Sequence, residues 1–268
     1  MLHILTAAGG NPTAIWLQDA PLHRTQYAAR GADLMTAGAA LARRHGGTMI
    51  PEQAGFLLRG ERHLEMAGGE LCGNATLSGA ALLSTHLGRS TFEMTTSDHP
   101  RRCPVSVSVA SDGVVSCMLT GLSLERTART VDGEAVCVVD MGGIVHVLVE
   151  ADFPDDCAAH HRAITDALGL SQRTAVGVCW FHRVAGAAVM EPVVRVQTTA
   201  GETFIHESAC GSGSIALSVA TGCTTIRQPT GEPITVRHTA GQTVLSARVQ
   251  RVLSTALRRE ETPCPPDR

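Results

Sequence analysis

The stretch that decides the fold is residues 70–87, ELCGNATLSGAALLSTHL, in which Cys72-Gly73 opens a run of small and apolar residues. Residues 207–220, ESACGSGSIALSVA, repeat this pattern with Cys210-Gly211 in the same position. A helix without a charged face is normally buried on all sides. We therefore expect two buried helices, over 74–87 and 213–220, each beginning just after a cysteine.

The segments around these two helices also follow one order. Both halves contain, in this order, strand-like segments, an amphipathic helix, further strands, the buried helix and more strands. The amphipathic helices are expected at 25–44 and 160–168, and alternating strands follow the first buried helix at 105–109 and 114–119. The sequence thus predicts an α+β fold with an architectural duplication, divided into domains at 1–128 and 129–257. The last segment, 258–268, contains three prolines, and we expect it to be a disordered tail.

The composition excludes several classes of protein. The chain has no lysine, so it has neither the Schiff-base lysine of a pyridoxal phosphate enzyme nor the lysine of a P-loop. A formal net charge of −3 gives no case for nucleic acid as a partner. No window approaches the roughly 20 apolar residues of a membrane span, and the first residues lack a signal-peptide pattern. We therefore expect a cytoplasmic protein with no membrane partner.

The nine cysteines are scattered, and no two lie within four residues of each other. This spacing does not fit a zinc site, and the pair His160-His161 has no third ligand nearby, so we expect no metal. Most of the cysteines should be buried thiols that pack as small hydrophobic groups. Cys72 and Cys210 differ from the others because each stands at the start of a helix.

A cysteine at a helix N-terminus is biased toward the thiolate, because the unpaired N–H groups favour negative charge there. Burial and the partner sulfur act in the opposite direction and raise the thiol pKa, and two coupled thiols titrate as a pair. If the two helices meet at one cleft, the backbone N–H groups of Gly73, Asn74, Gly211 and Ser212 can hold an amino-acid carboxylate. One sulfur could then remove the Cα proton as a base while the other returns a proton to the opposite face. Such a racemase needs no cofactor.

These residues resemble the diaminopimelate epimerase superfamily of cofactor-independent amino-acid racemases. Cys72-Gly73-Asn74-Ala75 and Ala209-Cys210-Gly211-Ser212-Gly213 are similar to its two cysteine signatures. Further similarities are Gly10-Asn11-Pro12, Gln53, and Met141-Gly142-Gly143 with His146. The resemblance implies two pseudo-symmetric domains, each a β-sheet wrapped around a central helix, with the site between them. It also implies that Cys72 and Cys210 are catalytic.

The chain departs from the epimerase pattern before the second cysteine, where residues 198–201, TTAG, lack the arginine that grips a second carboxylate. Residues 51–56, 66–76 and 228–231 instead resemble the histidine racemases of staphylopine-type metallophore pathways. That resemblance implies L- and D-histidine as substrates and Glu52 as a residue that holds the substrate. Diaminopimelate and diaminobutyrate remain alternatives. We further expect a homodimer.

The candidate substrate-binding residues are Asn11, Glu52, Gln53, Gly73, Asn74, Glu207, Gly211 and Ser212. Glu70 could equally be a favourable charge near a helix start, and His146 and His206 are expected to be structural. Two other function classes stay open. One is a non-catalytic amino-acid-binding protein on the same fold. The other is an oxidoreductase, since residues 211–216 formally match a dinucleotide fingerprint but lack its acidic partner.

Overall fold

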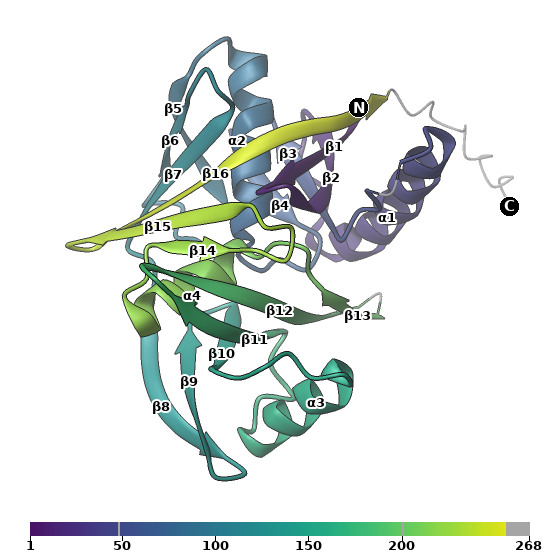
Figure 1. The fold of residues 1–268 in the computed structure, drawn as a ribbon. Helices are drawn as coiled ribbons and strands as arrows, with labels where there is room; N and C mark the ends of the chain where they lie inside the picture. The colour runs from purple at the N-terminus through teal and green to yellow at the C-terminus, as the bar shows by residue number, and fades with distance from the viewer. Residues whose placement is uncertain (48, 200, 256–268) are drawn as a thin grey trace, which may run out of the picture.

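The computed structural model describes residues 1–47, 49–199 and 201–255. Within those ranges the chain forms one mixed sheet of sixteen strands, with four α-helices inside it or against it and one short 3-10 helix, η1 (Arg24–Gln26). Figure 1 shows the strands grouped in two layers, one around α2 and one around α4.

Eight strands close into a ring, because β1 pairs with β2 on one side and with β16 on the other. All neighbours in the ring are antiparallel except β2–β3 and β4–β5, which are parallel. In spatial order the ring consists of β1 (Leu2–Ala7), β2 (Gly10–Gln18), β3 (Gln53–Leu58), β4 (His63–Met66), β5 (Thr91–Thr96), β6 (Val105–Val109), β7 (Val114–Thr120) and β16 (Gln242–Thr255).

The helix α2 (Gly73–Leu87) contacts all eight strands of the ring. Figure 1 shows it standing between β5–β7 on one side and β1–β4 on the other. Its small and apolar residues allow strands to approach from every direction, and ten of them are buried. The helix ends at Gly88, whose left-handed backbone (φ 63°) suits a glycine C-cap.

The other strands continue the sheet from β16 to an edge at β8, and β13 pairs with residues 193–198 of β12. The helix α4 (Gly211–Thr221) contacts β9, β10, β14, β15 and β16. In spatial order these strands are β15 (Pro233–Thr239), β14 (Thr225–Arg227), β12 (Ala187–Thr198), β11 (Ala175–Val184), β10 (Ile144–Val149), β9 (Glu134–Asp140) and β8 (Glu125–Val131), with β13 at Gly201–His206.

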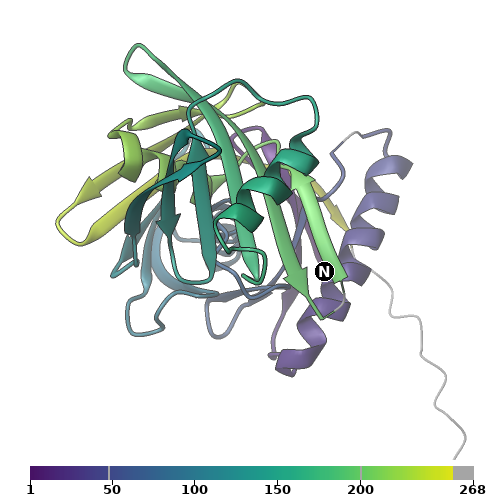
Figure 2. The ribbon, with the colours of Figure 1, turned by 90° about the horizontal axis from the view of Figure 1, so that it is seen from below.

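Two amphipathic helices cover the outside of the strands, as Figure 2 shows. α1 (Tyr27–Arg44) packs on β1–β3, and α3 (Cys157–Ala167) packs on β12. Gly31 and Gly38 of α1 allow a close approach: a Cβ on Gly31 would lie 2.3 Å from the Ala67 Cβ, and one on Gly38 would lie 2.7 Å from Pro51 Cγ. Glycines that weaken an isolated helix therefore serve its packing here.

The structure confirms a mixed α+β architecture and both helices that were expected after the cysteines. The strands β5, β8, β13 and β14 were not foreseen. In β8 most side chains are exposed, so no alternation of apolar residues marks it. The proposed boundary between residues 128 and 129 falls inside β8, while β16 pairs with β1, β7 and β15, and the division into domains stays a prediction. The proposed tail, 258–268, lies outside the described residues.

Candidate functional site

A cavity of about 330 Å³ lies between strands of the ring and strands of the second group. Eight of the ten residues selected from the sequence line it: Asn11, Glu52, Gln53, Cys72, Glu207, Cys210, Gly211 and Ser212. Gly73 and Asn74 do not line it and lie just behind Cys72 at the start of α2. The fold thus brings together residues that are up to about two hundred positions apart.

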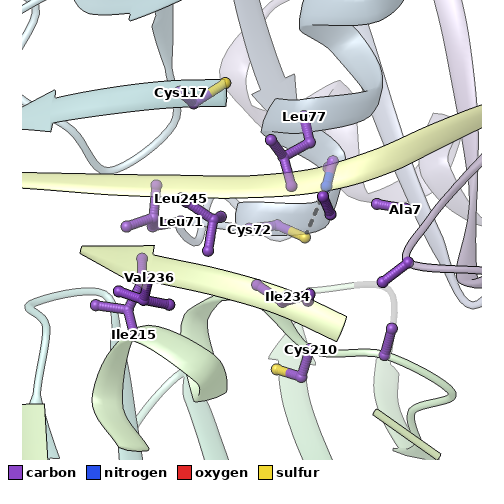
Figure 3. Close-up of a cluster of buried hydrophobic side chains, with 14 of the residues drawn as sticks. Ala7, Leu71, Cys72, Leu77, Cys117, Cys210, Ile215, Ile234, Val236 and Leu245 are labelled. Atoms are coloured by element: carbon purple, nitrogen blue, oxygen red, sulfur yellow. Dashed lines mark hydrogen bonds between the residues drawn. The ribbon is translucent and has the colours of Figure 1, made fainter. Parts of the chain in front are cut away.

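The two cysteines occupy equivalent positions, because each is the N-cap of a buried helix. Cys72 Sγ accepts the N–H of Ala75 at 3.3 Å, and Cys210 Sγ accepts the N–H of Gly213 at 3.3 Å. Both sulfur atoms are buried in one cluster of side chains, shown in Figure 3, that includes Ile234 of β15. Each sulfur therefore takes a backbone N–H that its helix leaves free.

The first turns of α2 and α4 touch each other at their glycines. A Cβ on Gly73 would lie 2.9 Å from the Gly211 Cα, and a Cβ on Gly211 would lie 2.8 Å from the Asn74 Oδ1. Only glycine permits this approach, since real Cβ atoms essentially never come within 3.0 Å of such neighbours. The N-termini of both helices consequently reach the same place.

Two asparagines fix the backbone immediately before Cys210. Asn11 Nδ2 and Asn74 Nδ2 each donate to the carbonyl oxygen of Ala209, at 2.9 Å in both cases. Asn11 adopts a left-handed backbone (φ 46°), which asparagine tolerates better than most residues. These amides position the second cysteine, and neither amide nitrogen was expected to act in that way.

Gln53 connects the first cysteine to a carboxyl group. The Cys72 thiol donates to Gln53 Oε1 at 2.6 Å, and Gln53 Nε2 donates to Glu207 Oε1 at 2.6 Å. Burial raises the pKa of Glu207 to about 8, and the nearby charge of Glu52 acts in the same direction. Glu207 therefore holds its proton through most of the neutral range.

The second cysteine also lies near Glu207, but its other neighbours differ from those of Cys72. Cys210 Sγ lies 3.6 Å from Ser212 Oγ, which is 2.9 Å from His146 Nε2, and His146 Nδ1 lies 3.6 Å from the Cys179 sulfur. Burial lowers the pKa of His146 to about 3, so this histidine is neutral. It links a serine beside the cavity to a third buried thiol, a role consistent with the structural position expected for it.

The expectation of a thiolate bias is wrong for the free protein. Burial raises the pKa of Cys72 and of Cys210, and Glu207 raises both further once its carboxyl is ionised. The N–H groups at the helix starts act in the opposite direction but are outweighed, because both thiols are removed from water. The sequence predicts two buried helices, but it does not show how completely the thiols at their first turns are removed from water.

Glu52 faces the cavity with both of its oxygen atoms engaged. Oε1 accepts from the Ser208 hydroxyl at 2.6 Å, and Oε2 accepts from the Ser208 N–H at 3.2 Å. Burial raises the pKa of Glu52. Glu52 thus anchors the segment that leads into Cys210, and its expected contact with substrate stays a prediction.

Sequence reasoning missed two residues of the site. Gln228 was noted only as part of the segment 228–231, yet its Oε1 accepts the Cys210 N–H at 2.8 Å and its Nε2 donates to Ser214 Oγ at 3.0 Å. Glu70 lines the cavity as a buried carboxyl, whereas a charge near a helix start was the competing expectation. A polar residue before Pro229 and an acid two residues before a cysteine were the available signals.

Two further observations bear on the kind of site. No group of three or more His, Cys, Asp and Glu side chains in the described residues could hold a metal ion. In the same part of the chain, no helix has the length and apolar character needed to cross a membrane.

Comparison with known proteins finds relatives that are described as racemases and epimerases. A family model described as the histidine racemase CntK N-terminal domain matches residues 44–257. A histidine racemase of Fusobacterium nucleatum is 27% identical over 179 residues, which cover 63% of this chain and 65% of that protein. The chain therefore aligns with less than two thirds of the length of this curated relative.

Solved structures with the same fold cover nearly the whole chain. A protein described as a predicted epimerase, from Pseudomonas aeruginosa, has a TM-score of 0.61 at 15% identity and covers 96% of this chain and 98% of its own. A phenazine biosynthesis protein of the PhzF family, from Enterococcus faecalis, has a TM-score of 0.54 at 16% identity and covers 94% and 96%. At these identities the likeness shows the fold alone.

Proposed function

The chain belongs to the histidine racemase family whose model matches residues 44–257, and we propose that it interconverts L- and D-histidine without a cofactor, using Cys72 and Cys210 as its two acid–base groups. One observation carries the proposal. Both cysteines are helix N-caps, both line one cavity, and their helices touch at Gly73 and Gly211.

The proposed reaction moves one proton off Cα and one proton onto it. A thiolate on one face takes the Cα proton, so that an S–H bond forms as the Cα–H bond breaks and the electron pair passes toward the carboxylate. The N-termini of α2 and α4 stabilise the charge that develops there. The thiol on the opposite face then gives its proton to Cα, and the two sulfurs exchange roles for the other enantiomer.

The reaction requires one cysteine as a thiolate, although burial favours the thiol form of both. The bound substrate brings an ammonium group into the cavity, and a positive charge within a few ångströms lowers the pKa of a thiol. The N–H groups of Ala75 and Gly213, each 3.3 Å from a sulfur, act in the same direction. We infer that the thiolate forms mainly in the substrate complex.

We also propose that the chain consists of two equivalent halves, each built around its cysteine-headed helix. Their first turns support this interpretation, since Thr76 Oγ1 donates to the Cys72 carbonyl at 2.7 Å and Ser214 Oγ donates to the Cys210 carbonyl at 2.6 Å. Both helices also end at a left-handed glycine, Gly88 or Gly222. Two equivalent helices suit a reaction in which the two sulfurs at their starts exchange roles.

The test is loss of the Cα proton in deuterium oxide for a panel of L- and D-amino acids, followed by NMR with no cofactor added. We expect exchange with histidine, with deuterium appearing mainly in the product enantiomer because the two bases are distinct groups. Cys72→Ser and Cys210→Ser should each reduce racemisation by at least about 10²-fold. Cys223→Ser, which changes a cysteine outside the cavity, is the matched control.

The outcomes separate the alternatives. Full racemisation by either single variant would overturn the two-thiol mechanism. Tight binding of an amino acid without any exchange would favour a non-catalytic binding protein. Faster exchange with diaminopimelate than with histidine would indicate that diaminopimelate is the substrate.

A further inference from the structure

The described side chains that line the cavity include acids but no bases. Four carboxyl groups line it, and no arginine or histidine is among the described lining residues of a chain that contains no lysine. The four are Glu52, Glu70, Glu202 and Glu207. Such a cavity disfavours a substrate with a second carboxylate and favours one whose side chain carries N–H groups or a positive charge.

Three of these carboxyls already have partners. Glu52 accepts two hydrogen bonds from Ser208. Glu202 lies 3.4 Å from the Arg162 guanidinium and 3.9 Å from that of Arg195. Each of them is thus held by a group of the protein itself.

Glu207 is the third, and its surroundings tie it to the reacting centre. It accepts from Gln53, and its charge raises the pKa of Cys72, Cys179 and Cys210. A substrate side chain has to point away from the sulfurs that flank its Cα. Glu207 is therefore better placed to act near the reacting Cα than to bind the end of the substrate side chain.

Glu70 has no such partner. It is 8% exposed, and its Oε2, like that of Glu207, is buried without a hydrogen bond among the described residues; Glu207 differs because its Oε1 accepts from Gln53. An unpaired buried carboxyl oxygen is costly, because it loses its water without any replacement. It is the kind of group that a ligand can satisfy.

The backbone around Glu70 leaves room for this carboxyl. A Cβ on Gly68 would lie 2.3 Å from Glu70 Oε2 and 2.9 Å from Val196 Cγ1, so any larger residue there would displace the carboxyl group. The nearby cation, Arg24, lies over Gly69 and pairs with Glu65. The geometry thus keeps Glu70 in place without pairing it to a cation, and burial raises the pKa of its carboxyl.

Building on the function proposed above, we propose that Glu70 determines substrate specificity by accepting an N–H group from the substrate side chain. The imidazole of histidine supplies such a donor, and so does the terminal ammonium of a short diamino acid. Aliphatic amino acids supply none, and a diaminopimelate carboxylate would repel the group. This assignment places the recognition of the side chain on the Cys72 side of the cavity, at the turn that leads into α2.

The test measures binding and exchange separately. Calorimetry on the full chain gives the Kd for L-histidine, L-2,4-diaminobutyrate, L-alanine and meso-diaminopimelate, and NMR in deuterium oxide gives the Cα exchange rate. The variants are Glu70→Gln, which keeps the shape and removes the charge, and Glu70→Asp, which keeps the charge and draws it back by one methylene. Glu93→Gln makes the same change on an exposed residue of β5 outside the cavity.

For Glu70→Gln we expect the Kd of histidine and diaminobutyrate to rise about 10- to 100-fold, and that of alanine to change less than about twofold. Glu70→Asp should retain part of the preference, and Glu93→Gln should behave as wild type. A purely structural role for Glu70 would weaken all the ligands alike. Equal losses for alanine and histidine, or an unchanged Kd for histidine, would overturn the proposal.

Failure of the racemase proposal would look different. If the wild-type protein binds histidine, loses it in Glu70→Gln and exchanges no Cα proton, the role of Glu70 stands and the racemase does not. If the Cα proton of histidine exchanges rapidly and at the same rate in wild type and Glu70→Gln, the racemase proposal is supported and the role of Glu70 is refuted. If neither histidine nor diaminobutyrate binds more tightly than alanine, Glu70 has no role in specificity.

Discussion

Gly73 and Gly211 are in direct backbone contact: a Cβ on either would lie 2.9 Å from the carbonyl carbon of the other. They are the first residues of α2 and α4, so the contact joins the two helix N-termini without any side chain between them. The two cysteines precede these glycines directly. Their common cavity is therefore a consequence of backbone packing and not of long side chains that reach toward each other.

We expect Gly73→Ala and Gly211→Ala each to lower the free energy of unfolding by about 1–3 kcal/mol, because the backbone has to shift to admit a methyl group. Racemisation should fall more steeply than stability, since the shift separates the two sulfurs. Urea unfolding and the exchange assay measure the two effects. Gly60→Ala is the control, as a Cβ there would have no atom within 4 Å.

Gln53 offers a second prediction, because its amide satisfies both the Cys72 thiol and Glu207 Oε1. Gln53→Ala leaves both of these groups without that partner, so we expect kcat to fall about 10- to 100-fold. Steady-state kinetics from each enantiomer, compared with the exposed Gln250→Ala, would show it. An effect confined to KM would mean that Gln53 serves substrate binding and not the cysteine.

The dependence of activity on pH follows from the raised pKa values of the thiols. Below the pKa of the base, the thiolate fraction rises about tenfold per pH unit, so kcat/KM should increase from pH 6 toward pH 8. Glu207, with a pKa of about 8, then ionises and opposes thiolate formation, so the increase should flatten above that pH. In Glu207→Gln the flattening should disappear. Activity that falls between pH 6 and 8 would contradict this account.

The sequence was sufficient for the elements that carry a local signal. The uncharged runs after Cys72 and Cys210 predicted both buried helices, and alternation predicted strands such as β7, where every second residue is buried. It was insufficient for β8, whose strand character comes from its pairing with β9 and not from apolar residues. Local patterns cannot report a pairing that only the folded sheet creates.

In the candidate site, too, features with a local sequence signal could be predicted and features that depend on the folded structure could not. Eight of the ten selected residues line the cavity, because motif residues next to the cysteines are brought there by the two helix starts. The two opposing effects on the thiol pKa were foreseen but their balance was not, since it depends on burial by strands distant in the sequence. The hydrogen-bonding state of Glu70 could likewise not be predicted, because the lack of a partner for its Oε2 among the described residues depends on the folded surroundings.

The last prediction concerns His146, which is fully buried and has a pKa lowered to about 3 by that burial. An unfolded chain binds a proton at this residue near pH 6.5, whereas the folded chain does not. The stabilising contribution is thus fully present above about pH 6.5 and is lost as the pH falls toward about 3. Between pH 6.5 and 4.5 the loss should be on the order of 2 kcal/mol.

Carboxyls with raised pKa values act in the opposite direction: burial favours the protonated form of Glu207, which therefore becomes more stabilising as the pH falls from about 8 toward 4.5. The informative quantity is consequently the difference between wild type and His146→Gln, measured by urea unfolding at each pH. His146→Gln can still place an amide beside Ser212, and it has no proton to bind. We expect the stability advantage of wild type over the variant to shrink as the pH falls through this window, and a constant difference would mean that His146 is already charged in the folded protein or does not titrate there.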